Sequence, residues 1–176
     1  KEGGRYKDIA EALGDRIRAE HGIKVIYKSS PGSEANIGFV QNGEADFAFF
    51  QPNVIKETSD FSDVGMIANV FPEVILTHVT KGLGYDPFIG KLEERKNTTI
   101  AVGEKGSGAA VNSEVILNHF DDGSMIGNRV TKSYDELISG FNSGTIDAAI
   151  VTTEENASIQ KMIAGTGKTK LIELPF

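Results

Sequence analysis

The chain has 176 residues, of which 39% are hydrophobic and 24% are charged, and it carries a formal net charge of −7. Its 18 lysine and arginine residues are scattered without a basic stripe, which argues against a nucleic-acid partner and against binding to an anionic membrane surface. No apolar run approaches the ~18 residues that would embed the chain in a membrane. The absence of cysteine excludes disulfides, thiol catalysis and thiolate metal sites.

The first half of the chain alternates helical and extended patterns. Taken in chain order, these patterns predict a helix over 7–20, a strand over 23–27, a polar turn over 29–34 that opens a helix ending at Gly43, a buried strand over 47–51 and a short helical piece from Pro52. The first helix is supported by apolar residues that recur at helical spacing opposite a charged face.

The second half continues the alternation. It predicts a strand over 74–80, a glycine- and proline-containing boundary over 81–87, a short helix over 89–95, a strand over 98–102, a helix over 109–120, a strand over 128–131, helices over 134–142 and 154–163, and a strand over 171–174. Strands that alternate with helices favour α/β architecture with largely parallel sheets.

One pattern occurs twice, in Ile37–Gln51 and in Ile138–Thr152. Each copy has an apolar helical stretch, a polar break and an apolar strand, and Gly43 and Asp46 of the first copy match Gly144 and Asp147 of the second. The glycines stand where a helix must end, because glycine adopts the left-handed cap cheaply. Chance recurrence of a Gly-x-x-Asp pattern is the alternative, but the flanking elements follow in the same order and favour a duplication.

We therefore predict two doubly wound α/β lobes around a cleft. Lobe one comprises residues 1–80 plus a returning strand over 170–176, and lobe two comprises residues 81–169. The chain opens on a glycine turn without an initiator methionine and ends on a strand. We interpret this as a fragment or processed chain, incomplete at the C-terminus, whose precursor carries a signal peptide.

Three glycine- or serine-rich turns precede helices: Gly3–Tyr6, Ser30–Ser33 and Gly106–Gly108. Free N–H groups and the positive end of the helix dipole make each turn a candidate anion site, and in doubly wound folds such turns lie at the edge of the sheet where ligands bind. Plain helix capping by serine is the alternative for any single turn. Three such turns in a duplicated chain favour a shared ligand cleft.

No catalytic or metal constellation emerges. Ala109-Ala110 stand where a phosphate loop requires Lys and Ser or Thr. The three histidines, His21, His78 and His119, do not pair at metal-ligand spacing, and His78 reads as a structural histidine inside a strand. We expect Asp46 and Asp147 to hydrogen-bond the turns at the start of their own strands. The sequence therefore predicts neither an enzyme nor a cofactor.

At these motifs the chain resembles the substrate-binding proteins of tripartite (TRAP) transporters, specifically the TAXI group. The motifs that carry the resemblance are Gly3-Gly4-Arg5-Tyr6, Gly32-Ser33-Glu34-Ala35-Asn36, Gly43-Glu44-Ala45-Asp46 through Gln51, and Gly106-Ser107-Gly108 with Asn112. The chain departs from the family pattern at Lys7, which follows a single tyrosine, at Pro52, and at Thr152–Asn156, where the family shows a glycine-proline turn.

The resemblance implies a type II periplasmic-binding-protein fold and a periplasmic or extracytoplasmic receptor. Such a receptor captures a small carboxylate, an organic acid or an amino acid, between its lobes and delivers it to membrane transporter subunits. The expected ligand-binding residues are Gly4, Tyr6, Gly32, Ser33, Gln51, Ser107, Gly108 and Asn112. The alternative is a ligand-sensing domain of a regulator or membrane sensor on the same fold.

Overall fold

The computed structural model describes residues 5–55, 63–83, 86–121 and 127–174. The chain divides into two units, Lys1–Gly65 and Met66–Phe176. The first contains α1 (Arg5–His21), α2 (Ser33–Gln41) and the 3-10 helix η1 (Pro52–Val54). The second contains β1 (Val74–Thr80), α3 (Leu92–Lys96), β2 (Thr99–Val102), α4 (Gly108–Phe120), β3 (Asn128–Thr131), α5 (Tyr134–Ser143), β4 (Ala148–Thr153), α6 (Ser158–Gly165) and β5 (Thr169–Ile172).

The strands of the second unit form one sheet in the order β3-β2-β4-β1-β5. β2 is parallel to both β3 and β4, whereas β1 runs antiparallel to β4 and to β5. The sheet is thus mixed, and the expectation of largely parallel pairing holds only for β2, β3 and β4. Those three strands are joined by helical crossovers, which parallel pairing requires.

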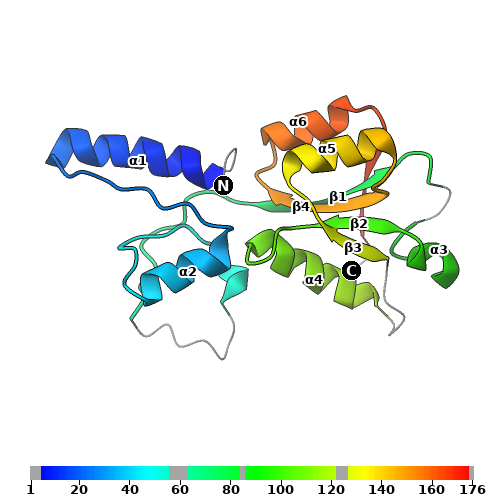
Figure 1. Cartoon of the computed structure of the whole chain (residues 1–176), viewed down its shortest axis with the longest axis horizontal. Coiled ribbons are helices and arrows are strands. Elements are labelled where there is room, and N and C mark those ends of the chain that lie inside the picture. Colours follow the sequence, from blue (N-terminus) through cyan, green and yellow to red (C-terminus); the bar gives the residue numbers. More distant parts are fainter. Residues whose placement is uncertain (1–4, 56–62, 84–85, 122–126, 175–176) are drawn as a thin grey trace. The chain divides into compact units, whose positions relative to one another are not determined.

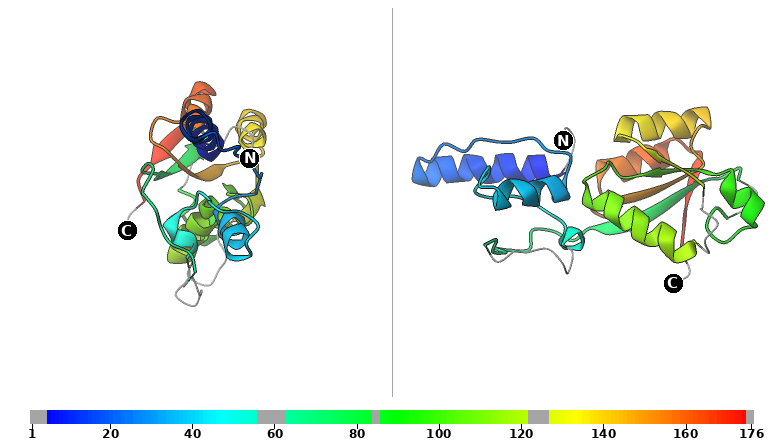
Figure 2. Two further views of the ribbon diagram at one scale, coloured as in Figure 1. Left: turned by 90° about the vertical axis from the view of Figure 1, so that its left-hand side faces the viewer. Right: turned by 60° about the horizontal axis from the view of Figure 1, so that its bottom comes forward.

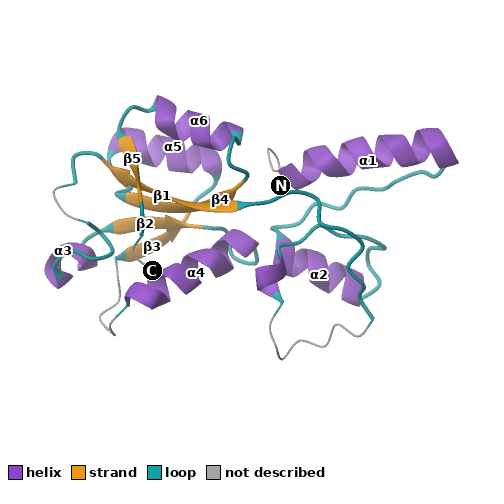
Figure 3. Ribbon diagram, turned by 180° about the vertical axis from the view of Figure 1, so that it is seen from behind, coloured by secondary structure: helices purple, strands orange, loops and turns teal. Residues whose placement is uncertain are grey.

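Helices cover both faces of this sheet. Figures 1 and 2 show α5 and α6 on one face and α4 on the opposite face, and Figure 3 shows the strands between these two helical layers from behind. Burial on both faces explains why β4 is an uninterrupted apolar run that ends in two threonines, with all six residues buried. This confirms the doubly wound α/β architecture for the second unit.

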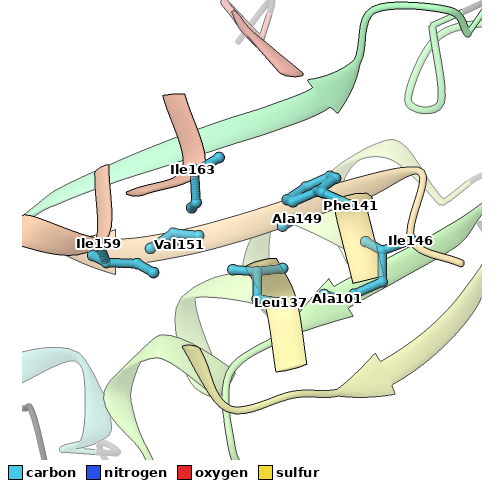
Figure 4. Close-up of a cluster of buried hydrophobic side chains, with 8 residues drawn as sticks. All are labelled: Ala101, Leu137, Phe141, Ile146, Ala149, Val151, Ile159 and Ile163. Carbon is cyan, nitrogen blue, oxygen red and sulfur yellow. The ribbon is translucent and has the colours of Figure 1, made fainter. Parts of the chain in front are cut away.

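Side chains of β4 alternate between two cores. Ala148 and Ile150 belong to the core beneath α4, together with Ile116 and Leu117 of that helix. Ala149 and Val151 face the other way and belong to the core beneath α5 and α6 (Figure 4). The latter core is composed of Ala101, Leu137, Phe141, Ile146, Ala149, Val151, Ile159 and Ile163. A fully buried Leu, Ile or Phe side chain stabilises the fold by about 1.5–3 kcal/mol, so these two clusters dominate the stability of the unit.

The first unit is helical and irregular over its described residues. The segments 23–27 and 47–51, both predicted as strands, pair with no strand there. The first segment packs on α1 through Tyr27, whose hydroxyl lies where a Cβ on Gly14 would stand. A strand requires a hydrogen-bonding neighbour, and the two segments have none in the described part of this unit. Their apolar sequence alone therefore did not make them strands.

The division between the units falls at Gly65, earlier than the boundary expected over 81–87. Two pairings account for the difference. Val74–Val79 of β1 pairs with Ala148–Thr153 of β4, and Thr77–Thr80 pairs with Thr169–Ile172 of β5. Both β1 and the strand expected to return to lobe one thus lie in the sheet of the second unit.

The internal repeat is visible in the backbone. Gly43 and Gly144 both have positive φ angles, 68° and 74°. Beyond each glycine the chain folds back identically: the N–H groups of residues 44 and 45 donate to Phe39 O, and those of residues 145 and 146 donate to Gly140 O. Donors and acceptors are separated by the same 101 positions as the glycines. The helices of the two copies thus end in the same kind of turn.

Candidate functional site

In the second unit, Ser107, Asn112 and Thr152 lie near the carboxyl ends of β2 and β4. Because β2 and β4 are parallel, their carboxyl ends meet at one edge of the sheet, and the loop from Gly103 to Ser107 leads from β2 into α4. This loop approaches the helix closely, since a Cβ on Gly103 would lie 2.4 Å from the backbone nitrogen of Ala110. Glycine is the one residue that permits this approach.

Ser107 caps α4. Its Oγ accepts a hydrogen bond from the N–H of Ala110 at 3.1 Å and donates to the carbonyl oxygen of Glu104 at 2.6 Å. The hydroxyl proton therefore points to the protein's own backbone. The N–H of Ala109, in the same first turn, donates to no group among the described residues, so it is the donor that remains for an anion.

Asn112, one turn further along α4, ties the helix to the end of β4. Its Nδ2 donates to Oγ1 of Thr152 at 3.1 Å, and Thr152 is buried. Asn112 thus lies at the predicted edge, where it joins a strand-end hydroxyl that the sequence analysis did not select. The signal available in the sequence was the Thr152-Thr153 pair directly after an apolar strand.

Tyr134 is a second residue that sequence reasoning missed. It begins α5 at the position that Ser33, a predicted site residue, occupies in the first copy, 101 residues earlier. Burial raises the pKa of the Tyr134 phenol, the carboxylates of Glu73 and Glu104 raise it further, and a hydrogen bond with Thr153 lowers it. The repeat itself was the signal that pointed to Tyr134.

In the first unit, the predicted residues cluster around the segment that follows α2. Ser33 is buried, and its Oγ accepts a hydrogen bond from the N–H of Gln51 at 3.0 Å. The ring of Tyr6 stacks on Phe49 with centroids 5.7 Å apart. Gly32 is the N-cap residue of α2 and supplies no side-chain cap. Tyr6 and Ser33 thus both contact the segment that ends at Gln51, which brings the three residues together within this unit.

Gly4 lies outside the described residues. Gly108 is the first residue of α4 and is buried. With Ser107 and Asn112 it forms the group of predicted residues in the second unit, all on the first two turns of one helix. The predicted residues therefore form two clusters, one in each unit.

The remaining candidate residues have structural roles. His78 is buried in β1, and its Nε2 lies 2.8 Å from Oε1 of Gln160 on α6. Burial lowers the pKa of His78, and the hydrogen bond with Gln160 partly opposes that shift. Across the described ranges, no group of three His, Asp or Glu side chains is arranged to hold a metal ion.

The aspartates of the repeat differ from expectation. Asp147 does not hydrogen-bond the turn of its own strand: its carboxylate accepts from the N–H of Thr99, the first residue of the neighbouring strand β2, at 2.8 Å. The reason is the parallel register, which brings the start of β2 beside the start of β4. Asp46, the matching residue, is exposed and makes no hydrogen bond or ion pair among the described residues.

Comparison with known protein families shows to which family the chain belongs. Residues 2–175 match the NMT1-like family. The chain belongs to the NMT1-like family. A comparison with curated proteins gave no match. No helix in the described part of this NMT1-like chain has the length and apolar character needed to cross a membrane.

Solved structures resemble this NMT1-like chain in fold. An amino acid ABC transporter substrate-binding protein, AbpA from Streptococcus pneumoniae Canada MDR_19A, bound to L-arginine, is similar with a TM-score of 0.56 and 20% identity over 95% of this chain and 64% of that one. An ancestral arginine-binding protein bound to arginine is similar with a TM-score of 0.52 and 18% identity over 95% of this chain and 69% of that one. This NMT1-like chain thus has the type II periplasmic-binding-protein fold and spans about two thirds of the length of both proteins.

Proposed function

We propose that this chain is the ligand-capturing part of an extracytoplasmic solute-binding receptor, and not an enzyme. The observation that carries the proposal is the match to the NMT1-like family over residues 2–175, together with a fold shared with two arginine-bound binding proteins. The predicted residues support the same conclusion, because they occupy helix starts beside strand ends, where α/β folds bind small ligands.

The ligand is a small carboxylate-bearing molecule, an organic acid or an amino acid. In the second unit the first turn of α4 offers the positive end of a helix dipole and the N–H of Ala109. The glycines at 106 and 108 let an anion approach the backbone. The Ser107 hydroxyl, which donates to Glu104 O, binds the carboxylate after rotating away from that carbonyl.

The receptor serves a membrane transporter. The motifs from Gly32 to Gln51 resemble the TAXI group, and this resemblance supports a transporter of the TRAP type. The likeness to AbpA favours an amino acid ABC transporter as the second candidate. Ligand uptake by membrane vesicles that carry either TRAP or ABC subunits, measured with and without added receptor, separates these two candidates. Uptake that the receptor raises only in ABC vesicles would remove the TRAP assignment.

A ligand screen tests the receptor function. Thermal-shift assays with L-arginine, L-glutamine, L-glutamate and succinate should show at least one compound that raises the melting temperature, and calorimetric titration then gives its affinity. A ligand present at 100 times its Kd stabilises the folded state by about 2.7 kcal/mol. If no carboxylate shifts the transition and a neutral, non-acidic compound does, the assignment of ligand class is wrong.

Ser107→Ala tests the role of the α4 turn. A hydroxyl hydrogen bond to a charged group is worth roughly 1.5–3 kcal/mol, so Ser107→Ala should weaken binding by about 10- to 100-fold. The matched control is Ser143→Ala, the same substitution at the last residue of α5, where the hydroxyl is hydrogen-bonded to Gly140 O and to the Thr145 hydroxyl. Affinity unchanged in Ser107→Ala would reduce this residue to a helix cap.

A further inference from the structure

The edge of the second unit that holds the candidate site brings the ends of three strands together. β4 lies between β2 and β1 in the sheet. β2 is parallel to β4 and ends at the same edge, whereas β1 is antiparallel and begins there, with Val74 paired to Thr153. Glu104, two residues after β2, and Glu73, the residue before β1, therefore flank the end of β4 on its two sides.

The phenol of Tyr134 lies at the same strand end. It is hydrogen-bonded to the side chain of Thr153, and the carboxylates of Glu73 and Glu104 both raise its pKa. Glu73, Glu104 and Tyr134 are each half-buried, and charges in such positions are screened less by salt than charges on an open surface. The end of β4 thus has two acidic side chains and an aromatic ring beside it.

The lysines in the neighbouring loops of the second unit are placed differently. Lys105 is exposed. Lys132, the residue after β3, has its Nζ 3.6 Å from Oε1 of Glu136. The charges that the second unit itself places around the Tyr134 phenol are therefore negative, and they favour a cationic group of a ligand.

Groups that suit a carboxylate lie at the same edge, on the side of α4. Thr152 is only 7% exposed, its Oγ1 accepts a hydrogen bond from Asn112 Nδ2, and its own hydroxyl proton meets no acceptor among the described residues. The N–H of Ala109 and the positive end of the α4 dipole lie one turn before Asn112. One edge thus offers hydrogen-bond donors for an anion and carboxylates for a cation.

We propose that the ligand is an α-amino acid, whose ammonium group binds between Glu73 and Glu104 beside the ring of Tyr134 while its carboxylate binds at the start of α4. This inference rests on the proposed receptor function and narrows its ligand from carboxylates in general to zwitterions. The carboxylates and the ring face both attract an ammonium group. An organic acid without an ammonium group brings only negative charge to this edge and is repelled by the same two glutamates.

Matched pairs of compounds test the requirement for an ammonium group. The common L-amino acids and their des-amino counterparts are titrated into the chain by calorimetry, for example L-glutamate with glutarate, L-glutamine with glutaramate and L-alanine with propionate. An amino acid that binds should do so at least about tenfold more tightly than its counterpart. Equal or tighter binding of the des-amino compound would overturn the inference and leave the receptor function intact. If neither series binds, the receptor function fails, and the inference fails with it.

Glu73→Gln and Glu104→Gln test which residues select the ammonium group. Each substitution removes one negative charge and keeps the size of the side chain. Each should weaken binding of the amino acid about tenfold and leave its des-amino counterpart bound equally or more tightly. A general loss of folding would instead weaken both compounds together.

Glu93→Gln is the matched control. It removes an exposed carboxylate on α3, which precedes β2 and so lies toward the other end of that strand. This variant should keep the wild-type ratio of the two affinities. A ratio that stays at the wild-type value in both Glu73→Gln and Glu104→Gln would overturn the assignment of the ammonium site.

Discussion

The carboxylate of Asp147, the residue before β4, accepts a hydrogen bond at 2.8 Å from the backbone N–H of Thr99, the first residue of the parallel neighbour β2. The N–H of Asp147 returns a hydrogen bond to Thr99 O, and its carbonyl accepts from Thr80 N–H. One residue thus connects β2, β4 and β1 at the edge of the sheet opposite the candidate site. This position explains why an aspartate follows the helix-ending turn.

Substitution of Asp147 should destabilise the fold in a graded way. Asp147→Ala leaves the Thr99 N–H without its acceptor and should lower the free energy of unfolding by about 1–3 kcal/mol. Asp147→Asn keeps an oxygen acceptor without the charge and should cost less. Urea denaturation measures both, with Glu155→Gln as an exposed control in the same unit. Equal stability of the wild type and Asp147→Ala would show that the hydrogen bond between the Asp147 carboxylate and Thr99 N–H is dispensable.

Gly144 should tolerate substitution poorly despite open space around it. Its φ angle is 74°, and a Cβ there would meet no atom within 4 Å, so any loss is due to backbone strain and not to a clash. Gly144→Ala should cost about 1–2 kcal/mol, because L-residues disfavour the left-handed region, and Gly144→Asn should cost less.

Gly165→Ala is the matched control for that strain. It stands in equally open space at the last residue of α6 without a positive φ. There alanine should be neutral or stabilising by up to about 1 kcal/mol. Thermal denaturation that gives Gly144→Ala and Gly165→Ala the same stability would contradict the strain argument.

Ser107 should contribute to stability independently of any ligand. Loss of its bond to Ala110 N–H in Ser107→Ala should lower the unfolding free energy by about 1 kcal/mol. Ser107→Asp should retain most of that stability, because aspartate also caps helices, while its negative charge should repel a carboxylate ligand. If Ser107→Ala and Ser107→Asp both lose stability and ligand affinity together, helix capping and ligand binding cannot be separated at this residue.

The buried His78 should make the protein less stable in mild acid. Its pKa is lowered from the ordinary value of 6.5 by burial. Well above pH 6.5 the imidazole is neutral in the folded and in the unfolded chain, and its contribution to the free energy of unfolding is fully present. As the pH falls through 6.5 toward the lower pKa of the folded state, the unfolded chain binds the proton first. Stability should therefore fall with decreasing pH by up to about 1.4 kcal/mol per pH unit.

Chemical denaturation between pH 7.5 and pH 5 measures this slope. His78→Gln should flatten it, even if the variant is less stable at every pH. His21→Gln, which removes an exposed imidazole at the end of α1, is the control variant. A slope unchanged in His78→Gln would assign the acid sensitivity to other groups.

The sequence by itself determined the helices, the repeat and the layered order of the second unit. The expected helix over 134–142 is α5 (Tyr134–Ser143), and the expected strand over 128–131 is β3 with the same bounds. Helix signals are local: the cap at Ser133, the apolar stripe and the terminal Gly144 all lie within one turn of the element they define. The buried strands of the second unit were equally clear, since their apolar runs have helices on either side.

Only the tertiary structure decided which extended segments became strands and which residues share an edge. The segments 23–27 and 74–80 carry similar β-branched sequences, yet only the latter is a strand, because β4 and β5 supply the hydrogen-bonding partners that 23–27 lacks among the described residues. In the same way, the sequence selected Asn112 but not its partner Thr152, and Ser33 but not the matching Tyr134. Strand pairing and side-chain contacts join residues far apart in the chain, and local sequence patterns do not indicate which of these residues meet.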